Sequence, residues 1–557
     1  MSAETSERRI VVAGPGAGKT TTSVALIQEI GSRDTNADRV VLFVSFSRAA
    51  MRAAFDAFGD SLADLPVDVL AMTLDSLAWQ LTEETAGDGE PDFEDVVRRA
   101  ADKLQNDYDG DLDDAVHLIV DEAQDLSAPR RRLLAAVVDR LPDDAGVTVF
   151  GDPLQSIYEF FEDDSDGVSA WQDLVDDLHE RGIERTYHLD QDHRARRRGP
   201  KRIAQASKSL RQLTDPSLTA DELAELLTSF SRMSVDEFVS RASEWKGPTA
   251  VLARTNAEVA ALFTTLVDHG LNCGWREPGR AGPAVAGWVA ELWHHSKGRN
   301  VSRDDFIAFT ADRDGVDDRW FRLLLGEAES RGHVDWEGFA RSLRASRDPM
   351  KPWFAESAAA VTVSTIHQAK GLEWDNVAVA SADNLAMALG ARAAEPELLF
   401  VALSRARDRV VLLDWQQPYT RRTKGLIYRP HPRSGSPLTV RLTPDALMSD
   451  RPIGGGEGQR ALENADKNSL VEFELLASGH AGWPTYRCLV DGQSVGMTSP
   501  KFGQTFAELL RSGQHRWPSL GPVPMDGVET RWSKADRIEF WLQPRPFGMA
   551  DVKYEKG

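Results

Sequence analysis

Cysteine is nearly absent from this chain, since only Cys273 and Cys488 occur among its 557 residues. Two thiols are too few for a disulfide framework or a zinc cluster. Long apolar runs are also missing, because no stretch approaches the roughly 20 apolar residues that a membrane-spanning helix needs. The opening residues, MSAETSERR, lack the apolar centre of a signal peptide. These absences predict a cytoplasmic protein that makes no membrane contact.

Positive charge is in short supply as well. The formal net charge is −22, which argues against non-specific coating of nucleic acid by the whole surface. A local basic track is compatible with this balance, because charges act over about 10 Å at ordinary salt. The apolar content of 41% is ordinary for a globular protein. A chain of 557 residues exceeds one hydrophobic core, so three or four compact units are expected.

Short β-rich runs alternate with helical patterns, such as residues 21–29 and 130–141, in two stretches of the chain. In the first stretch the runs are residues 10–12, 40–46, 69–72, 117–120 and 147–150. In the second they are residues 249–253, 361–365, 377–380 and 410–414. Strands that alternate with helices predict a parallel sheet covered on both faces. The sequence therefore predicts an α/β fold with two such units.

The expected boundaries follow from changes in composition. The first α/β unit spans residues 1–190 and the second spans residues 191–425. Each is interrupted by a short helical insertion, an acidic one at about 79–115 and a Trp-rich one at about 272–356. The stretch 426–467, which contains the run GGGEG, has the composition of a flexible linker. The remainder, 468–557, is expected to be a small C-terminal α+β module.

The strongest local motif is A-G-P-G-A-G-K-T, which follows a β-rich run and opens a helical pattern. Glycines let backbone N–H groups converge on phosphate oxygens, and the helix N-terminus adds a positive dipole. Lys19 would neutralise the β- and γ-phosphates, and the Thr20 hydroxyl would bind Mg²⁺. The expected nucleotide contacts are Ala13, Gly14, Pro15, Gly16, Ala17, Gly18, Lys19, Thr20 and Thr21. The alternative is a structural Gly-rich turn, which the full pattern disfavours.

A second motif, H-L-I-V-D-E-A-Q-D, spans residues 117–125. An apolar strand ends in two acidic residues, at the edge where an α/β sheet presents its ligand site. Asp121 would hold Mg²⁺, and Glu122 would orient and deprotonate an attacking water. Taken alone, the pair could equally be a solvated strand end, but the phosphate loop favours the catalytic interpretation.

Four ordered segments resemble the motifs of the UvrD/PcrA/Rep group of superfamily 1 helicases. They are DEAQD at 121–125, GDPLQSIY at 151–158, TIHQAKGLEW at 365–374 and VALSRAR at 401–407. The resemblance covers about residues 8–415, and the AKGLE segment is similar to the branch that moves 3′→5′. It implies two RecA-like P-loop NTPase domains that hydrolyse ATP between them with the help of Mg²⁺.

The resemblance also implies roles for residues outside the phosphate loop. Gln155 matches the residue that senses the γ-phosphate, and Arg194 and Arg405 match two arginines that stabilise its charge. A guanidinium suits this role because it is planar and stays charged. Glu373 matches a residue near the ribose and γ-phosphate, and His193 stands where the family commonly stacks a tyrosine on the base.

DNA contacts are expected from the same resemblance. Rings that stack on unpaired bases contribute about 1–3 kcal/mol each without sequence preference. The aromatic and polar positions that match the strand-binding track are Phe46, Thr73, Ser76, Tyr158, Phe160, Arg254, Asn256 and His367. From spacing alone an aromatic near a strand end is more often part of the core, so the DNA assignment depends on the motif match.

Three departures from the family pattern stand out. No Gln precedes the first β-rich run, where the family reads adenine, so the preference for ATP over other nucleotides is less secure. Asp75 replaces the usual His near the DNA track and places a negative charge there. The insertions are short, which weakens the case for processive unwinding more than the case for translocation.

The C-terminal module offers little chemistry. Asp536, Asp551 and Lys553 resemble the spacing of a metal-dependent nuclease, but no upstream acidic partner is evident and a surface hairpin is the preferred interpretation. A module that binds a partner protein is more compatible with this segment.

Two functions are compatible with these features. The first is an ATP-dependent 3′→5′ translocase or helicase on single-stranded DNA or on a junction of single-stranded and duplex DNA. The second is a DNA-stimulated ATPase that acts as a sensor subunit of a DNA repair or phage-defence complex and unwinds little.

Overall fold

The computed structural model divides into two compact units, residues 1–232 with 369–413 and residues 233–368 with 414–557. It describes residues 6–33, 39–45, 67–82, 93–106, 112–157, 170–213, 216–276, 284–311, 321, 324–325, 332–345, 359–386, 395–432, 437–476, 482–510, 517–533 and 538–554. No helix among these residues is long and apolar enough to cross a membrane.

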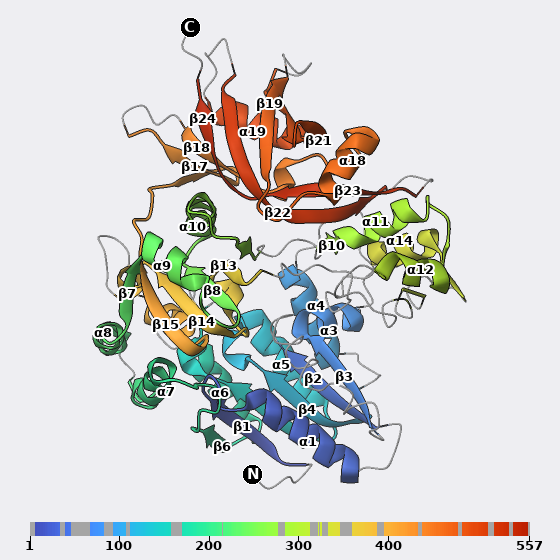
Figure 1. Cartoon of the computed structure of the whole chain (residues 1–557). Coiled ribbons are helices and arrows are strands. Elements are labelled where there is room, and N and C mark those ends of the chain that lie inside the picture. Colours follow the sequence, from blue (N-terminus) through green and yellow to red (C-terminus); the bar gives the residue numbers. More distant parts are fainter. Residues whose placement is uncertain are drawn as a thin grey trace. The chain divides into compact units, whose positions relative to one another are not determined.

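The first unit is built on a six-stranded parallel sheet with the strand order β3-β2-β4-β5-β1-β6 (Figure 1). The strands are β1 (Arg8–Ala13), β2 (Val40–Ser45), β3 (Asp68–Thr73), β4 (Ala115–Asp121), β5 (Gly146–Gly151) and β6 (Arg185–Leu189). All five β-rich runs expected in this half form strands. Because β4, β5 and β1 are neighbours, the residues that follow their carboxyl ends are brought close together.

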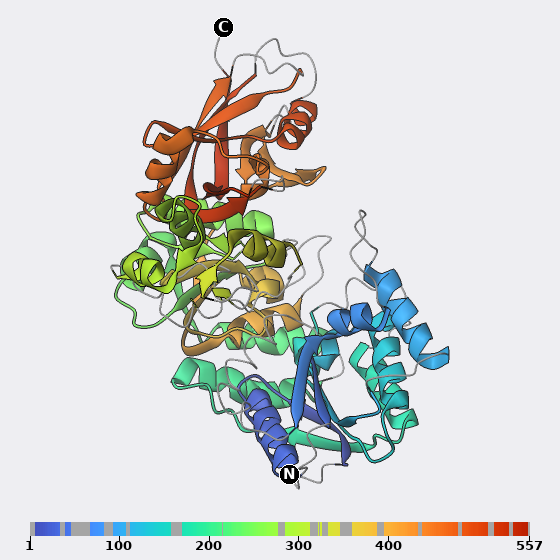
Figure 2. The ribbon, with the colours of Figure 1, turned by 90° about the vertical axis from the view of Figure 1, so that its right-hand side faces the viewer.

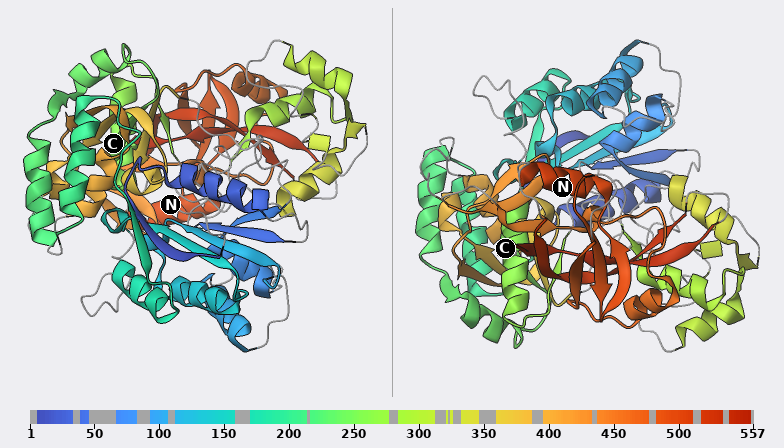
Figure 3. Two further views of the ribbon diagram at one scale, coloured as in Figure 1. Left: turned by 90° about the horizontal axis from the view of Figure 1, so that it is seen from below. Right: turned by 90° about the horizontal axis from the view of Figure 1, so that it is seen from above.

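Helices cover both faces of this sheet (Figure 3). On one face α1 (Lys19–Arg33) buries Leu26, Ile27 and Ile30 against alternate residues of the strands. The other face is covered by α3 (Leu74–Thr82), α4 (Phe93–Asn106), α5 (Ala128–Arg140) and α6 (Ala170–Glu180). The strands are therefore apolar on both sides, which is typical of parallel sheets in α/β proteins.

A second sheet has the order β7-β15-β14-β8-β13-β9. Its strands are β7 (Ser231–Ser234), β8 (Thr249–Ala253), β9 (Gly274–Trp275), β13 (Val361–Thr365), β14 (Trp374–Ala380) and β15 (Ala406–Asp414). The pairs β14–β15, β8–β13 and β13–β9 are parallel. Two parallel sheets of this kind are typical of RecA-like domains, so the α/β prediction is confirmed.

The helices associated with the second sheet are distributed over both units. The first unit contains α7 (Arg198–Leu210), α8 (Pro216–Leu227), α16 (Asp383–Ala386) and α17 (Pro396–Leu403). The second unit contains α9 (Val235–Ala242) and α10 (Asn256–Asp268). The short helix α15 (Ile366–Ala369) lies where the chain passes from one unit to the other.

The C-terminal part of the second unit is an antiparallel sheet, coloured orange to red in Figure 2. Its main path runs β16-β17-β18-β24-β22-β19-β20-β21, and β10 and β23 also pair with β22. The strands are β10 (Val285–Ala286), β16 (Arg421–Thr423), β17 (Leu426–Pro430), β18 (Pro437–Leu442), β19 (Leu470–Leu476), β20 (Thr485–Val490), β21 (Gln493–Met497), β22 (Ser519–Trp532), β23 (Phe540–Pro546) and β24 (Gly548–Lys553). Helices α18 (Gly455–Glu463) and α19 (Pro500–Leu509) accompany it.

The expectation of a linker in this region is wrong. Residues 426–467 are not a linker, because β17 and β18 are strands of the C-terminal sheet and α18 packs beside it. The helical insertion expected at about 272–356 is joined to the C-terminal module. Its helices α11 (Gly287–His295), α12 (Arg303–Thr310) and α14 (Trp336–Ala345) share one hydrophobic core with the C-terminal strands.

The division into units also differs from the expected boundary at residue 190. Residues 191–232 and 369–413 fall into the first unit. These segments supply three side chains to the region of the phosphate loop. Arg194 pairs with Glu373, Lys370 pairs with Asp125, and Arg405 donates to Gln155.

Candidate nucleotide site

The phosphate loop joins the end of β1 to the start of α1, as its motif predicts. Gly16 and Gly18 have φ angles of 70° and 87°, in the left-handed region that favours glycine. A Cβ atom on Gly16 would lie 2.2 Å from Asp192 Oδ1, and one on Gly14 would lie 2.1 Å from Arg211 Nη2. Gly16 is therefore required by both conformation and space, whereas a larger residue at position 14 would displace the Arg211 guanidinium. The His193 backbone N–H donates to the Gly16 carbonyl at 2.9 Å.

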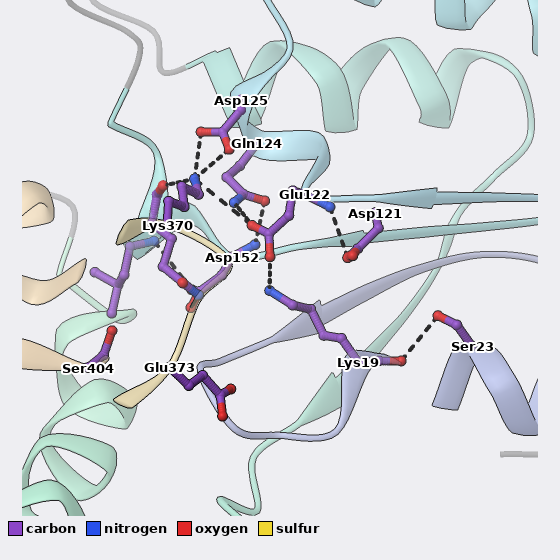
Figure 4. Close-up of polar contacts among 12 residues, drawn as sticks. Lys19, Ser23, Asp121, Glu122, Gln124, Asp125, Asp152, Lys370, Glu373 and Ser404 are labelled. Atoms are coloured by element: carbon purple, nitrogen blue, oxygen red, sulfur yellow. Dashed lines mark hydrogen bonds and ion pairs between the residues drawn. The ribbon is translucent and has the colours of Figure 1, made fainter. Parts of the chain in front are cut away.

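The two acidic residues at the end of β4 face the phosphate loop. Lys19 Nζ lies 2.9 Å from Glu122 Oε1 (Figure 4). Glu122 has a φ angle of 55°, and its backbone N–H donates to Asp121 Oδ1 at 3.0 Å. Gln124 Nε2 donates to the other Glu122 oxygen at 2.6 Å. The geometry thus fixes Glu122 between an ammonium and an amide.

Burial and neighbouring charges act against each other in this cluster. Burial alone would lower the pKa of Lys19, but the carboxylates of Glu122, Asp121 and Asp152 raise it overall. Burial would raise the pKa of Glu122, yet Lys19 and Lys370 hold it well below its usual value. For Asp121, burial and the nearby Glu122 charge raise the pKa to about 6. Glu122 is therefore the carboxylate that carries the charge, while the pull of Lys19 and Lys370 on Asp121 is outweighed by burial and by the Glu122 charge.

Gln155 sits in a buried hydrogen-bond chain just after β5. Arg405 Nη2 donates to Gln155 Oε1 at 2.7 Å, and Gln155 Nε2 donates to Asp152 Oδ2 at 2.7 Å. Arg405 also donates from Nε to the Val401 carbonyl at 3.0 Å, which anchors its stem to α17. Burial, followed by repulsion from Arg194, lowers the pKa of Arg405 to about 10. The guanidinium nevertheless remains charged at neutral pH.

Arg194 belongs to a second cluster around Glu373. Arg194 Nη1 lies 3.0 Å from Glu373 Oε1, and Arg407 Nε donates to Glu373 Oε2 at 3.0 Å. Burial would raise the pKa of Glu373, but Arg194 and Arg407 lower it overall. Burial lowers the pKa of Arg194, although Glu373 opposes that effect. Glu373 therefore holds two arginines at the site.

These groups line one cavity of about 640 Å³, all of it within the first unit. The expected site residues that line it are Gly14, Pro15, Gly16, Gly18, Lys19, Thr20, Thr21, Asp121, Glu122, Gln155, His193, Arg194, Glu373 and Arg405. Arg196 and Arg407 add two further cations. A cavity of this size fits a small-molecule ligand, and its cations suit a polyanion such as a triphosphate.

Ala13 and Ala17 are exceptions among the expected nucleotide contacts. Their side chains are buried in the apolar core beneath α1 and do not line the cavity. The physical reason is that Ala13 ends a central strand and Ala17 faces the helix side of the loop. Any contribution of these residues to phosphate binding would come from the backbone.

The donor set at Thr20 and Asp121 fits Mg²⁺. Both residues line the same cavity, and burial together with the neighbouring Glu122 charge raises the pKa of the Asp121 carboxylate, an effect that a bound cation would oppose. Among the residues that the structure describes, no group of three or more His, Cys, Asp or Glu could hold a metal. This composition suits Mg²⁺, which takes one or two protein ligands and completes its shell with water and phosphate oxygens.

Two buried ion pairs were missed by the sequence analysis. Lys370 Nζ lies 2.6 Å from Asp125 Oδ1 and contacts the backbone carbonyl of Gln155 (Figure 4). Arg211 donates to both oxygens of Asp152, at 3.0 and 3.1 Å. Lys370 and Asp125 stand inside the AKGLE and DEAQD segments, so the motifs could have drawn attention to them. Arg211 follows α7 and belongs to no motif.

Asp125 has an unusual electrostatic setting. Burial raises its pKa to about 7, although Lys370 opposes this shift and Glu122 adds to it. Asp152 has no exposed side-chain surface and is neutralised by Arg211. Asp152 accepts directly from the Gln155 side chain, whereas Asp125 acts on Gln155 only through Lys370, which contacts its backbone carbonyl.

Of the expected DNA contacts, Thr73 and Ser76 lie at the start of α3. Thr73 Oγ1 accepts from the Ser76 backbone N–H at 3.1 Å and lies 2.8 Å from Ser76 Oγ. Arg130 donates to both oxygens of Asp75, at 2.8 and 3.0 Å. Asp75, the negative charge beside the expected DNA contacts, is therefore neutralised by Arg130.

The other expected DNA contacts fall into two groups. Phe46, Tyr158 and Phe160 lie outside the described residues. Arg254, Asn256 and His367 belong to the second unit. Arg254 donates its backbone N–H to Glu258 Oε2 at 2.9 Å, and Asn256 begins α10.

Two family profiles match the chain. A profile described as an AAA domain matches residues 2–161. A profile described as a UvrD-like helicase C-terminal domain matches residues 360–413. No curated protein has a significantly similar sequence.

Among solved structures, the chain is similar to the Pif1 helicase from Candida albicans. The two share 15% identity over 74% of this chain and 91% of that chain, with a TM-score of 0.34. A similarity this distant carries no argument about mechanism. The two profile matches contain the phosphate loop, the paired acids, Gln155, Glu373 and Arg405, which also meet at one cavity. The chain is therefore similar to UvrD-like helicases over residues 360–413 and to AAA domains over residues 2–161, the two segments that contain most of this site.

Proposed function

We propose that the chain is an ATP-dependent translocase or helicase that moves 3′→5′ on single-stranded DNA in the cytoplasm. One observation carries the ATPase part of this proposal. A single cavity collects the phosphate-loop lysine, the paired acids, the glutamine after β5 and two buried arginines. These are the parts that phosphoryl transfer requires: cations for the phosphates, a residue that positions water, and arginines for the charge that develops on the γ-phosphoryl group.

In the proposed reaction, the triphosphate enters the cavity and Lys19 turns from Glu122 toward the β- and γ-phosphates. Glu122 then loses the cation that holds its pKa low, and its carboxylate becomes a better acceptor for a proton from water. Bound between Thr20 and Asp121, Mg²⁺ would neutralise charge on the phosphate oxygens. Arg194 and Arg405 stabilise the equatorial oxygens of the transferring group.

Gln155 is suited to report the state of the γ-phosphate. It is held by Arg405 on one side and Asp152 on the other, and its backbone carbonyl contacts Lys370. A shift of Arg405 toward phosphate would break its bond to Gln155. The side chain would then be free to turn, and the segment that follows it, which contains the expected contacts Tyr158 and Phe160, would receive the change.

The substrate and direction rest on the resemblance to the UvrD-like family. The expected strand contacts, including Thr73 and Ser76, need unpaired bases, so single-stranded DNA should stimulate turnover more than blunt duplex. The AKGLE segment supports the 3′→5′ direction. Unwinding, where present, should require a 3′ single-stranded tail.

A second candidate is a DNA-stimulated ATPase that reports DNA ends to a partner protein in repair or phage defence. One observation favours it. The insertion at 272–356 shares a core with the C-terminal sheet, and β10 pairs with β22. An insertion built into another module in this way is less free to swing as a grip on duplex. The partner would bind through the C-terminal module.

Three assays on the full chain test the proposal. ATP hydrolysis is measured alone, with single-stranded DNA and with blunt duplex, and strong stimulation by the single strand alone is expected. A fluorophore at the 5′ end of a single strand should report the motor after a delay that grows with strand length. Unwinding of a partial duplex with a 3′ tail separates the helicase from the sensor. Turnover indifferent to DNA would refute the motor, and a length-dependent delay at the 3′ end would reverse the direction.

A further inference from the structure

One stretch of this acidic chain carries only positive charge. Residues 415–444 contain six Lys and Arg residues and no Asp or Glu, whereas acids outnumber bases 87 to 65 in the whole chain. The structure places this stretch on three neighbouring antiparallel strands, β16, β17 and β18, at one end of the C-terminal sheet (Figure 1). The ATP site uses none of these residues.

The strand register puts three of the arginines on one face. Arg422 pairs with Ile427, so their side chains share a face, and Arg429, two residues along β17, shares it too. Arg429 pairs with Thr439, and Arg441 lies two residues beyond Thr439 on β18. We call this side of the three strands the arginine face. It is formed by Arg422 on β16, Arg429 on β17 and Arg441 on β18.

The opposite face of the same strands is the hydrophobic core. Val440 and Leu442 of β18 are fully buried there, together with Ala550 of β24. The arginine face is therefore the outer face of the sheet. Arg422 and Arg429 are exposed, and Arg441 is partly buried.

Charge on this face is poorly compensated. Among the residues that the structure describes, no ion pair is found for Arg422, Arg429 or Arg441. Burial lowers the pKa of Arg441, repulsion from Arg422 lowers it further, and Asp445 opposes both. Asp551 on β24 pairs with Thr439 and therefore lies on the same face, where its one negative charge stands against three guanidiniums. Like charges on neighbouring strands destabilise a sheet. An anionic partner would therefore reduce the repulsion between these arginines.

The hairpin that carries the face is conformationally fixed. Lys424 and Gly425 form a two-residue turn between the paired residues Thr423 and Leu426, with φ angles of 47° and 86°. Two positive φ angles in a two-residue loop match the twist of antiparallel strands and hold their register. Beside the hairpin, the guanidinium of Arg421 lies 5.7 Å from the centre of the Tyr419 ring, which is 66% exposed.

We propose that the arginine face binds the phosphate backbone of a nucleic-acid duplex. A guanidinium donates two parallel hydrogen bonds to phosphate, and three of them on a rigid sheet match a preformed row of phosphates. A single strand is gripped mainly by stacking on aromatic rings, and none of the three residues that define the face is aromatic. An acidic protein partner would need apolar anchors at the centre of its interface, whereas Ile427 between the arginines is only 9% exposed.

This surface goes beyond the proposed motor function, because binding would need no ATP and would not depend on base sequence. It would hold duplex DNA or RNA against the C-terminal module while the motor acts on a single strand. Phosphate contacts also predict strong salt dependence, since each one releases counterions from the duplex.

Binding of a fluorescein-labelled blunt duplex to the full chain, without nucleotide, tests the proposal. The double variant Arg422→Gln and Arg429→Gln should bind the duplex about tenfold more weakly at low salt. The slope of log affinity against log salt should fall by about 0.9 for each contact removed. The matched control is Arg487→Gln, because Arg487 is an exposed arginine of the same sheet that is already paired with Glu474. Thermal unfolding confirms that all variants are folded.

Several outcomes would overturn the inference. Unchanged duplex affinity and salt slope in the double variant would remove the arginine face from nucleic-acid binding and leave a protein partner as the better explanation. An equal loss in Arg487→Gln would show that only general charge matters. A loss confined to a single strand of matched length would contradict the duplex assignment. ATP hydrolysis measured in parallel keeps the two proposals separate, since the double variant should retain the basal rate.

Discussion

Lys19 and Glu122 form a buried ion pair of 2.9 Å, so the phosphate-binding cation and the water-orienting carboxylate neutralise each other in this structure. Each partner has its own role once a triphosphate is present. Lys19 then binds the phosphates, and the Glu122 carboxylate orients the attacking water. Breaking the pair from either side should therefore stop turnover but leave different binding properties.

We expect Lys19→Ala and Glu122→Gln both to abolish ATP hydrolysis. Lys19→Ala removes a phosphate cation, and it leaves Glu122 buried with less neutralising charge, so nucleotide affinity should fall at least about tenfold. Glu122→Gln keeps the lysine and frees it from its ion pair, so ATP should bind and persist. Titration with a fluorescent ATP analogue measures both. The control is Arg33→Ala at the far end of α1, where Arg33 forms an exposed pair with Glu29. Equal losses of affinity in the two site variants would contradict these roles.

Gln155 and Arg405 should behave as one functional unit because they bond directly at 2.7 Å. Arg405→Lys keeps a positive charge but loses the planar guanidinium, and Gln155→Ala removes its acceptor. Each single variant should lower kcat about 100-fold or more, with a smaller change in nucleotide affinity. The double variant should be little worse than either single variant, because the interaction is already lost. Losses in kcat that multiply would show that the two side chains act independently.

The sequence predicts the parallel sheets well because their strands are short apolar runs between helices. Thr249–Ala253 and Val361–Thr365 begin and end in the structure where the pattern places them. The C-terminal sheet was not predictable in this way. β17 and β18 are short strands rich in Pro and Arg, and β18 is completed by a pairing of Thr439 with Asp551, far along the chain. No local window contains that information.

The same contrast holds at the site. Lys19, Asp121 and Glu122 could be found because the phosphate loop and the acidic strand end have recognisable residue patterns. Arg211 could not, because its contact with Asp152 depends on how the segment after α7 folds back over the phosphate loop. For Ala13 and Ala17 the motif marks positions but not the direction of side chains, so that their side chains lie in the core could not be foreseen.

Asp125 should make stability depend on pH. Burial raises its pKa from 3.8 to about 7, so the folded chain keeps a proton that the unfolded chain loses. The stabilisation is complete below the unfolded pKa near 4 and is lost as pH rises toward 7. Relative to Asp125→Asn, the wild type should lose up to roughly 4 kcal/mol between these limits. Urea unfolding of both proteins across that range measures the difference in their free energies of unfolding. If this difference does not change with pH, the pKa of Asp125 is not raised by folding.

The last prediction concerns Arg211, which joins the phosphate loop to the segment that holds Gln155. Its guanidinium donates to both oxygens of the fully buried Asp152, and Nη2 occupies the space where a Cβ of Gly14 would be. Arg211→Ala should destabilise the fold by about 3–5 kcal/mol, because it leaves a buried carboxylate without its cation. Nucleotide affinity should fall too, since Asp152 also accepts from Gln155 and from the Leu154 backbone.

Adding Asp152→Asn to Arg211→Ala separates charge from packing. A neutral amide no longer needs the cation, so the double variant should regain much of the stability measured by urea unfolding. It should not regain nucleotide affinity, because the support of the phosphate loop at Gly14 is still missing. Lys208→Ala is the control, since Lys208 is an exposed cation on the last turn of the same helix. If Arg211→Ala binds the ATP analogue as tightly as Lys208→Ala does, Arg211 stabilises the fold but does not position the site.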